Sequence, residues 1–192
     1  MKRVLSIFSF AFAVFAASSA WALMDRGDGI HTESWFLNGT TFYEMKAEAT
    51  DAASADKGLI LVWEQQGCGS CLKLHEVNFQ DAKLTKYLKA NFHMMSMNIF
   101  GEMPIVDFDG VDKPEKDMAA RLAVHRSPTT QFYDGAGNLV FTLPGYLDPE
   151  RYLAAAMFVK EKGYEDDAVK RNFLVWFAKN KTRVGQTYAD GS

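Results

Sequence analysis

"LILVWEQQGCGSC", residues 59–71, leads from a short apolar run to both cysteines of the chain, Cys68 and Cys71. The run Leu59–Trp63 is typical of a strand that is buried on both faces of a sheet. Apolar residues recur after Cys71 at spacings that favour a helix. These residues are Leu72, Leu74, Val77 and Phe79. The sequence therefore predicts Cys68 at the point where a strand ends and a helix begins.

The start of a helix favours an ionised thiol at Cys68. Free backbone N–H groups and the helix dipole stabilise an anion there, so the thiolate form is favoured. Cys71 follows one helical turn later, close enough to attack a mixed disulfide at Cys68 and to release the partner. Gly69 and Ser70 add little bulk between the two cysteines. This arrangement is typical of dithiol exchange.

A metal site and a structural disulfide are two other uses for such a pair. A zinc site needs two further ligands, and the chain has no second cysteine pair. His75, four residues after Cys71, could supply a third ligand from the same helix. A single pair is too little cross-linking for a fold built on disulfides. We therefore expect redox exchange, without a metal and without a cofactor.

The first residues have the pattern of an export signal. Lys2 and Arg3 precede an uncharged, largely apolar run at 4–17, and "AWA" at 20–22 matches the pattern that a signal peptidase cuts. The run is short for a membrane span, and no later segment stays uncharged over the ~18 residues that a spanning helix needs. We expect residues 1–22 to be a cleaved leader, giving a periplasmic protein with no stable membrane insertion. An uncut anchor is the alternative.

Charge and length narrow the class of protein further. The chain holds 21 basic and 24 acidic residues, and the basic residues form no dense run, so nucleic acid is not an expected partner. Its 192 residues are enough for one domain with a sizeable core. An oxidising compartment lets a cysteine pair persist as a disulfide.

The remaining chain predicts a mixed α/β fold. Residues 40–55 are expected to be helical, "HMMSMNI" at 93–99 favours a strand, and "TTQFY" and "LVFTL" flank a turn as in a β-hairpin. Asp148 before Pro149 is a good helix start, because aspartate caps a helix and proline suits its first turn. This order predicts a mixed central sheet with helices on both faces.

We expect four parts in the chain. Their boundaries are a leader at 1–22, an N-terminal extension with a helix at 23–57, a main domain at 58–162, and a C-terminal helix with a loose tail at 163–192. The last helix is expected over Asp167–Lys179, and the tail is expected to be loose after Lys181.

Two clusters of residues could bind a metal ion, but a structural role in the fold explains each of them more simply. Met94, Met95 and Met97 beside His93 could suggest Cu(I), but methionine commonly fills gaps in a core, so a core strand is expected. Four acidic residues in the stretch 100–112 lack the spacing of an EF-hand, so a solvated, irregular loop is expected. They are Glu102, Asp107, Asp109 and Asp112.

Pro128 follows Ser127 immediately before the first predicted hairpin strand. A Ser-Pro pair alone indicates a turn, and most X-Pro bonds are trans. Between a helix and an antiparallel strand, however, this architecture often needs a cis proline. The position of Pro128 therefore agrees with redox exchange at the cysteines.

At this point the chain resembles the thioredoxin superfamily. The matching motifs are "LILVWEQQGCGSC", "SPTTQFYD" and "GYLDPERYLAAAMF", and the resemblance covers residues 40–162. "EQQGCGSCLKLHE" together with "LPGYLDPERY" is most similar to exported SoxW-type thioredoxins, which are linked to sulfur-oxidation systems. "CLKLHE" also resembles the catalytic domain of periplasmic disulfide isomerases.

The resemblance implies a thioredoxin-like fold and a division of roles. Cys68 would be the nucleophile, Cys71 the resolving thiol, and Pro128 a cis proline facing them. Pro128 would shape the groove for a partner's chain, and Ser127 would offer it backbone hydrogen bonds.

The function implied is an exported thiol–disulfide oxidoreductase that reduces disulfides of other exported proteins. A membrane thiol electron donor would recharge it. A disulfide isomerase or oxidant is an alternative, since the reduction potentials of proteins in these roles differ by only tens of millivolts. A metal-binding or chaperone-like module that uses the same groove without turnover is another.

Three residues depart from the thioredoxin pattern. Gly67 stands where a tryptophan is usual, Val62 replaces a buried aspartate six residues before the first cysteine, and Ser127 replaces a threonine. Glu64 lies two residues after Val62, on the same strand face by alternation. We hypothesise that Glu64, if buried, takes the proton from Cys71 in place of the aspartate. A solvated glutamate at the strand end is the alternative.

Overall fold

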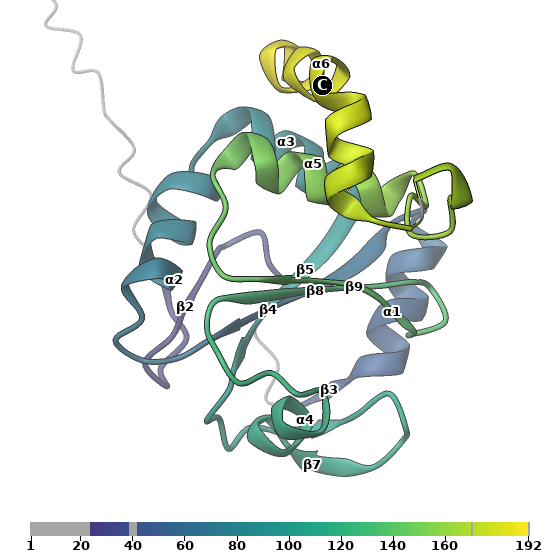
Figure 1. Cartoon of the computed structure of the whole chain (residues 1–192). Coiled ribbons are helices and arrows are strands. Elements are labelled where there is room, and N and C mark those ends of the chain that lie inside the picture. The colour runs from purple at the N-terminus through teal and green to yellow at the C-terminus, as the bar shows by residue number, and fades with distance from the viewer. Residues whose placement is uncertain (1–23, 39–41, 170, 192) are drawn as a thin grey trace, which may run out of the picture.

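The computed structural model describes residues 24–38, 42–169 and 171–191. The predicted leader, residues 1–22, lies outside them. A four-stranded mixed sheet organises the described chain (Figure 1). In spatial order its strands are β5 (Phe92–Asn98), β4 (Gly58–Glu64), β8 (Thr129–Tyr133) and β9 (Leu139–Pro144).

The apolar run predicted as a buried strand is the inner strand β4. It pairs in parallel with β5 and antiparallel with β8, and its residues from Leu59 onward are buried. A strand with neighbours on both edges and helices on both faces has no solvated side, which explains its continuous apolar sequence. β8 and β9 form the predicted hairpin around Asp134, which accepts backbone N–H groups from Ala136 and Asn138.

Helices cover both faces of the sheet (Figure 1). α1 (Met45–Ser54) packs on one face, and α3 (Ala82–Asn91) and α5 (Pro149–Lys160) pack on the other. Asp81 and Asp148 cap α3 and α5, because the Asp81 carboxylate accepts the N–H groups of Lys83 and Leu84 and the Asp148 carboxylate accepts that of Arg151. The predicted fold class and the predicted helix start at Asp148 are confirmed.

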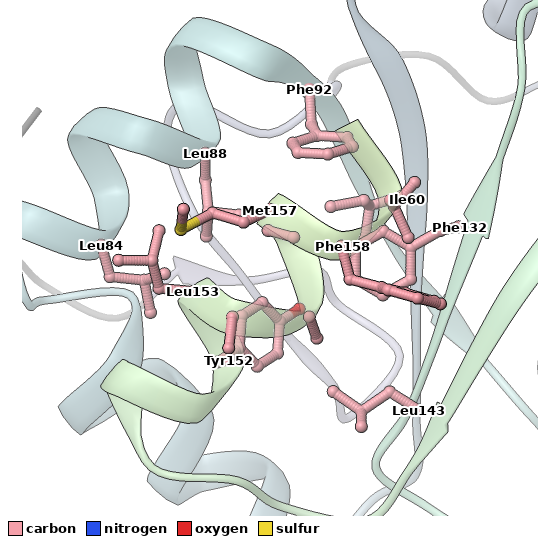
Figure 2. Packing of buried hydrophobic residues seen from close by; sticks show 14 of the residues in the cluster. Ile60, Leu84, Leu88, Phe92, Phe132, Leu143, Tyr152, Leu153, Met157 and Phe158 are labelled. Atoms are coloured by element: carbon pink, nitrogen blue, oxygen red, sulfur yellow. The ribbon is translucent and has the colours of Figure 1, made fainter. Parts of the chain in front are cut away.

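Side chains of β4 alternate between two cores. Ile60 and Val62 contribute to the core beneath α3 and α5, and Leu61 and Trp63 to the core against α1. Figure 2 shows the first core, in which sheet residues meet side chains of both helices. The helix residues in that view are Leu84, Leu88, Tyr152, Leu153, Met157 and Phe158. The three methionines of β5 are buried in these cores, as predicted; they are Met94, Met95 and Met97.

The acidic stretch 100–112 differs from the irregular, solvated loop expected from the sequence. It contributes to a small sheet made of β3 (Tyr43–Glu44), β6 (Pro104–Val106) and β7 (Asp112–Pro114), and α4 (Glu115–Arg121) follows it. Asp107 is fully buried. Its negative charge is compensated there, because Arg121 donates to both of its oxygens over 2.6 Å and Lys113 pairs with it at 3.1 Å. The strands are too short for residue alternation to reveal them.

A long C-terminal helix corrects the prediction of a loose tail. α6 (Phe173–Asp190) continues well beyond Lys181. Val184 is fully buried, and the Tyr188 hydroxyl donates to Asp81 at the start of α3 over 2.6 Å. Tertiary contacts therefore order the segment that was expected to be loose.

The ends of α6 also differ from the prediction. Asp167–Val169 is a separate 3₁₀ turn, and Asn172 caps α6 by accepting the N–H groups of Leu174 and Val175. Gly191, with φ of 63°, ends the helix in the left-handed conformation that glycine favours. Within the described residues, no helix combines the length and the apolar character needed to span a membrane.

Candidate active site

The two cysteines lie where the sequence predicts them, and they form a disulfide bond. Cys68 is the N-cap of α2 (Gly69–Lys73), and its Sγ accepts a hydrogen bond from the Cys71 N–H over 3.1 Å. The start of the helix thus supplies a donor to the sulfur that carries negative charge when the bond is reduced. Gly67, with φ of 73°, takes the left-handed conformation that turns the chain into α2.

Burial distinguishes the two sulfurs. Cys68 is half-buried, whereas Cys71 is 1% exposed. Gly69 and Ser70 between them are exposed to solvent. An incoming disulfide therefore has access to Cys68 and not to Cys71.

Pro128 lies at the same edge of the sheet as the cysteines. The Ser127–Pro128 peptide bond is cis. Thr129, the next residue, pairs with Trp63 near the end of β4, which is where the chain leaves for Cys68. The Pro128 carbonyl accepts the Gly145 N–H over 2.8 Å, so the proline is tied to the end of β9. Pro128 is buried and Ser127 is half-buried.

Glu64 is buried rather than solvated, with 1% of its surface exposed. Its Oε1 lies 2.8 Å from His75 Nε2, and its Oε2 is buried without a hydrogen-bond partner. The strand alternation is as expected, because Val62 and Glu64 both lie on the α5 side of β4. Burial is the condition on which the hypothesis of a proton acceptor depends.

His75 is a site residue that the sequence analysis considered only as a metal ligand. It lies in a π-helical turn, Leu74–Asn78, directly after α2, and it is fully buried. Its Nδ1 lies 2.8 Å from Glu33 Oε1, so the ring is held between two carboxylates, Glu33 and Glu64. Glu33 also accepts from Gln80 over 3.2 Å. We call Glu33, His75 and Glu64 the buried triad.

The charge of the triad follows from these contacts. Burial by itself disfavours a charged ring, but the hydrogen bonds that the ring donates to Glu33 and Glu64, together with their negative charges, outweigh it and raise the pKa of His75 to about 9. His75 is therefore an imidazolium at neutral pH. Each ring nitrogen then donates to one carboxylate.

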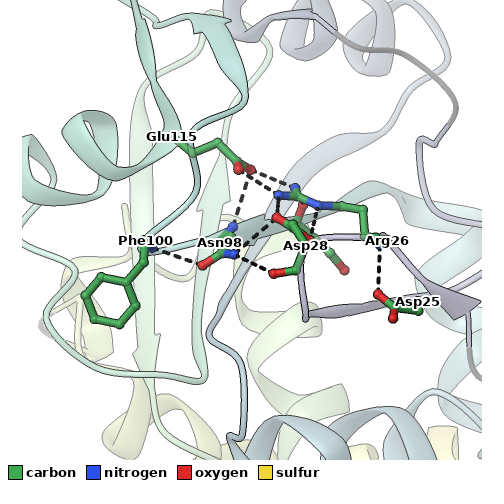
Figure 3. A network of polar contacts seen from close by, with 8 residues as sticks. Asp25, Arg26, Asp28, Asn98, Phe100 and Glu115 are labelled. Atoms are coloured by element: carbon green, nitrogen blue, oxygen red, sulfur yellow. Dashed lines mark hydrogen bonds and ion pairs between the residues drawn. The ribbon is translucent and has the colours of Figure 1, made fainter.

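An N-terminal segment, residues 24–38, brings Glu33 to the triad. It includes the antiparallel pair β1 (Met24–Asp25) and β2 (His31–Thr32). The Arg26 guanidinium donates to both oxygens of the buried Glu115 over 2.7 Å (Figure 3). Glu115 in turn accepts the N–H of Asn98, the last residue of β5, over 3.3 Å. Because β5 runs parallel to β4, this network fixes the segment at the sheet edge that carries the cysteines.

The sequence contained one signal for His75 and none for Glu33. The four-residue spacing from Cys71 indicated that both side chains share a helix face. Glu33 lies far from both in the sequence and outside any periodic pattern. Within residues 24–38, 42–169 and 171–191, no group of three His, Cys, Asp or Glu side chains is placed to hold a metal ion.

Comparisons with known proteins concern the family and the fold of the chain. A model of the thioredoxin-like domain matches residues 45–160. A thioredoxin-fold protein from Helicobacter pylori is 25% identical to the chain, with a TM-score of 0.53, covering 70% of this chain and 86% of that one. A thioredoxin from Thermus thermophilus is 21% identical, with a TM-score of 0.49, covering 64% and 88%. No match is found among curated proteins.

A thioredoxin fold with a disulfide between Cys68 and Cys71 at a helix start defines a thiol–disulfide oxidoreductase. The family match spans more than half of the chain, which therefore belongs to the thioredoxin-like domain family. The buried triad reaches beyond that match, because Glu33 precedes residue 45.

Proposed function

We propose that this oxidoreductase reduces disulfides of other exported proteins in the periplasm, as a SoxW-type thioredoxin, and that a membrane thiol donor recharges it. The half-exposed Cys68 at the start of α2, with the buried Cys71 behind it, carries the proposal. The leader pattern at residues 1–22 supports export. The motifs "EQQGCGSCLKLHE" and "LPGYLDPERY" support the SoxW type.

The proposed reaction begins from the dithiol. The Cys68 thiolate attacks one sulfur of the partner's disulfide, forms a mixed disulfide and releases the other partner sulfur as a thiolate. Cys71 then loses its proton to Glu64, and its thiolate attacks Cys68 Sγ. The second partner sulfur leaves as a thiolate. Two electrons pass to the partner, whose thiolates take up protons, and the Cys68–Cys71 disulfide forms.

The proposed substrate groove lies between the cysteine loop and the cis proline. Gly69 and Ser70 are exposed, so a partner chain can approach Cys68 closely. Ser127, half-buried beside Pro128, offers backbone groups to an extended partner segment. The proposed substrate-binding surface consists of Gly69, Ser70, Ser127 and Pro128.

Trapping of partners tests the exchange. In a Cys71→Ser variant the mixed disulfide on Cys68 cannot be resolved, so we expect disulfide-linked adducts with exported proteins, visible on non-reducing gels and removed by dithiothreitol. A Cys68→Ser variant, the matched control, should accumulate none. Absence of adducts in the Cys71→Ser protein would contradict the proposed exchange.

The equilibrium with glutathione tests the direction of the reaction. A reductant should have a potential near that of thioredoxins, about −270 mV, whereas a strong oxidant lies near about −120 mV. A measured value close to the second figure would overturn the reducing role and leave the exchange itself intact.

A further inference from the structure

The buried triad is unusual because it keeps two carboxylates and an imidazolium away from water. Glu33 is 7%, Glu64 1% and His75 0% exposed. Buried charges are destabilising unless they are paired, and even then the pairing gives little net stability. His75 also lies in a π-helical turn, a feature that occurs frequently at functional sites. Structure alone therefore does not account for the triad.

The triad is left with one unused acceptor atom. His75 donates from Nε2 to Glu64 Oε1 and from Nδ1 to Glu33 Oε1, and Gln80 donates to Glu33. Glu64 Oε2 is buried and has no hydrogen-bond partner. A buried acceptor atom that is left without a donor is costly, so this atom has a free position for an incoming hydrogen.

Cys71 is the buried thiol that lies nearest to the triad along the chain. It is buried, and it precedes His75 by four residues in a helical run that continues from α2 into the π-helical turn. Glu64 ends β4, immediately before the loop that carries Cys68. Cys71 and Glu64 thus flank the loop that carries Cys68, and His75 links the helical run of Cys71 to Glu64.

The other rings around the triad do not take the place of His75 between the two carboxylates. The His31 ring lies edge-on to His75 with ring centroids 5.7 Å apart, whereas both nitrogens of His75 pair with the carboxylates. Tyr152 of α5 is kept neutral, because burial and the charge of Glu64 raise its pKa. The remaining rings against His75 are those of Phe36 and Phe79, which carry no charge.

We propose that His75, anchored by Glu33, is a positioning residue that holds Glu64 by Oε1 and leaves Oε2 free to accept the Cys71 proton. The inference rests on the proposed function and adds two residues to it. When Cys71 attacks the mixed disulfide, its S–H proton passes to Glu64 Oε2, the Cys71–Cys68 S–S bond forms, and the partner's sulfur leaves with the electron pair. Without His75, Glu64 loses the contact that holds Oε1 and so directs Oε2.

The release of a coloured thiol isolates this step. Reduced protein is given one equivalent of 5,5′-dithiobis(2-nitrobenzoate), and the second thiolate released, as Cys71 resolves the adduct on Cys68, is followed by stopped flow from pH 6 to 9. In the wild type we expect a release rate that changes little around neutral pH. In His75→Gln we expect about tenfold slower release at pH 7 and a rate that rises about tenfold per pH unit, because hydroxide must then take the proton. Glu33→Gln, which keeps His75, should give an intermediate loss.

Two controls separate the possible outcomes. His93→Gln changes a half-buried histidine on β5 that takes no part in the triad, and it should behave as the wild type. Capture of the dye by Cys68, measured in a Cys71→Ser background, should not change when His75→Gln is added.

The inference is overturned if His75→Gln releases the second thiolate with the same rate and pH profile as His93→Gln. Equal slowing of capture and release, which a general structural loss produces, also overturns it. If the wild type releases no second equivalent, Cys71 does not resolve the adduct and the proposed function fails instead.

Discussion

Val62 and Glu64 lie two residues apart on β4 and reach the same side of the sheet, yet their surroundings differ completely. Val62 packs in the core beneath α5, and Glu64 meets the imidazolium of His75. Alternation along a strand was enough to predict the side of the sheet. It could not predict the partner, because Glu33 approaches from a segment that no local pattern connects to the cysteines.

The raised pKa of His75 predicts how stability depends on pH. The folded pKa, about 9, lies above the unfolded value of 6.5, so the stabilisation is complete below pH 6.5 and is lost as the pH rises through 9. We expect the unfolding free energy of the oxidised protein to fall over this range by on the order of 2–3 kcal/mol. Urea titrations at several pH values measure this change.

The matched variant for this measurement is Glu33→Gln. It removes one of the two carboxylates that raise the pKa of His75, so the decrease in stability should begin at lower pH. An unfolding free energy that is flat from pH 6.5 to 9 in the wild type would show that His75 is not held as an imidazolium.

At the scale of elements, the reliable predictions came from strong local signals. The apolar strand before Cys68, the hairpin around residues 134–138 and the capping Asp148 were all read correctly, because each depends on neighbouring residues. The three-residue strands β6 and β7 were missed, because they form only through pairing with each other and with β3. α6 was cut short, although Gly191 is a recognisable stop signal.

Packing of α6 against α5 is expected to stabilise the fold. Trp176 is 4% exposed and lies edge-on to Phe158 of α5 with ring centroids 5.7 Å apart. Trp176→Ala should lower the unfolding free energy by about 3–5 kcal/mol, because it leaves a large cavity. Leu174→Ala, at an exposed position of the same helix, should change it by less than about 0.5 kcal/mol. Chemical denaturation of the two variants checks this, and equal effects would mean that α6 does not pack as described.

At the scale of the whole molecule, one sheet edge gathers segments from along the described chain. β4 delivers Glu64 and Cys68, β8 begins beside Pro128, and β5 ends at Asn98, where the N-terminal segment is tied down (Figures 1 and 3). The parallel β4–β5 pair explains why this edge carries the chemistry, since the carboxyl ends of parallel strands lie together. The fold and the place of the two cysteines after a strand and at the start of a helix could be predicted, because these follow from local patterns. The N-terminal segment could not be predicted, because it is positioned by long-range ion pairs such as Arg26–Glu115.

The reactivity of Cys68 in the reduced protein tests the central claim most directly. The start of α2 and the Cys71 N–H favour its thiolate, so alkylation by iodoacetamide should reach half its maximal rate below roughly pH 7 and should exceed that of free cysteine at neutral pH. Mass spectrometry of Cys71→Ser, in which Cys68 is the single thiol, assigns the modified residue. An alkylation profile that matches free cysteine across this range would contradict the account.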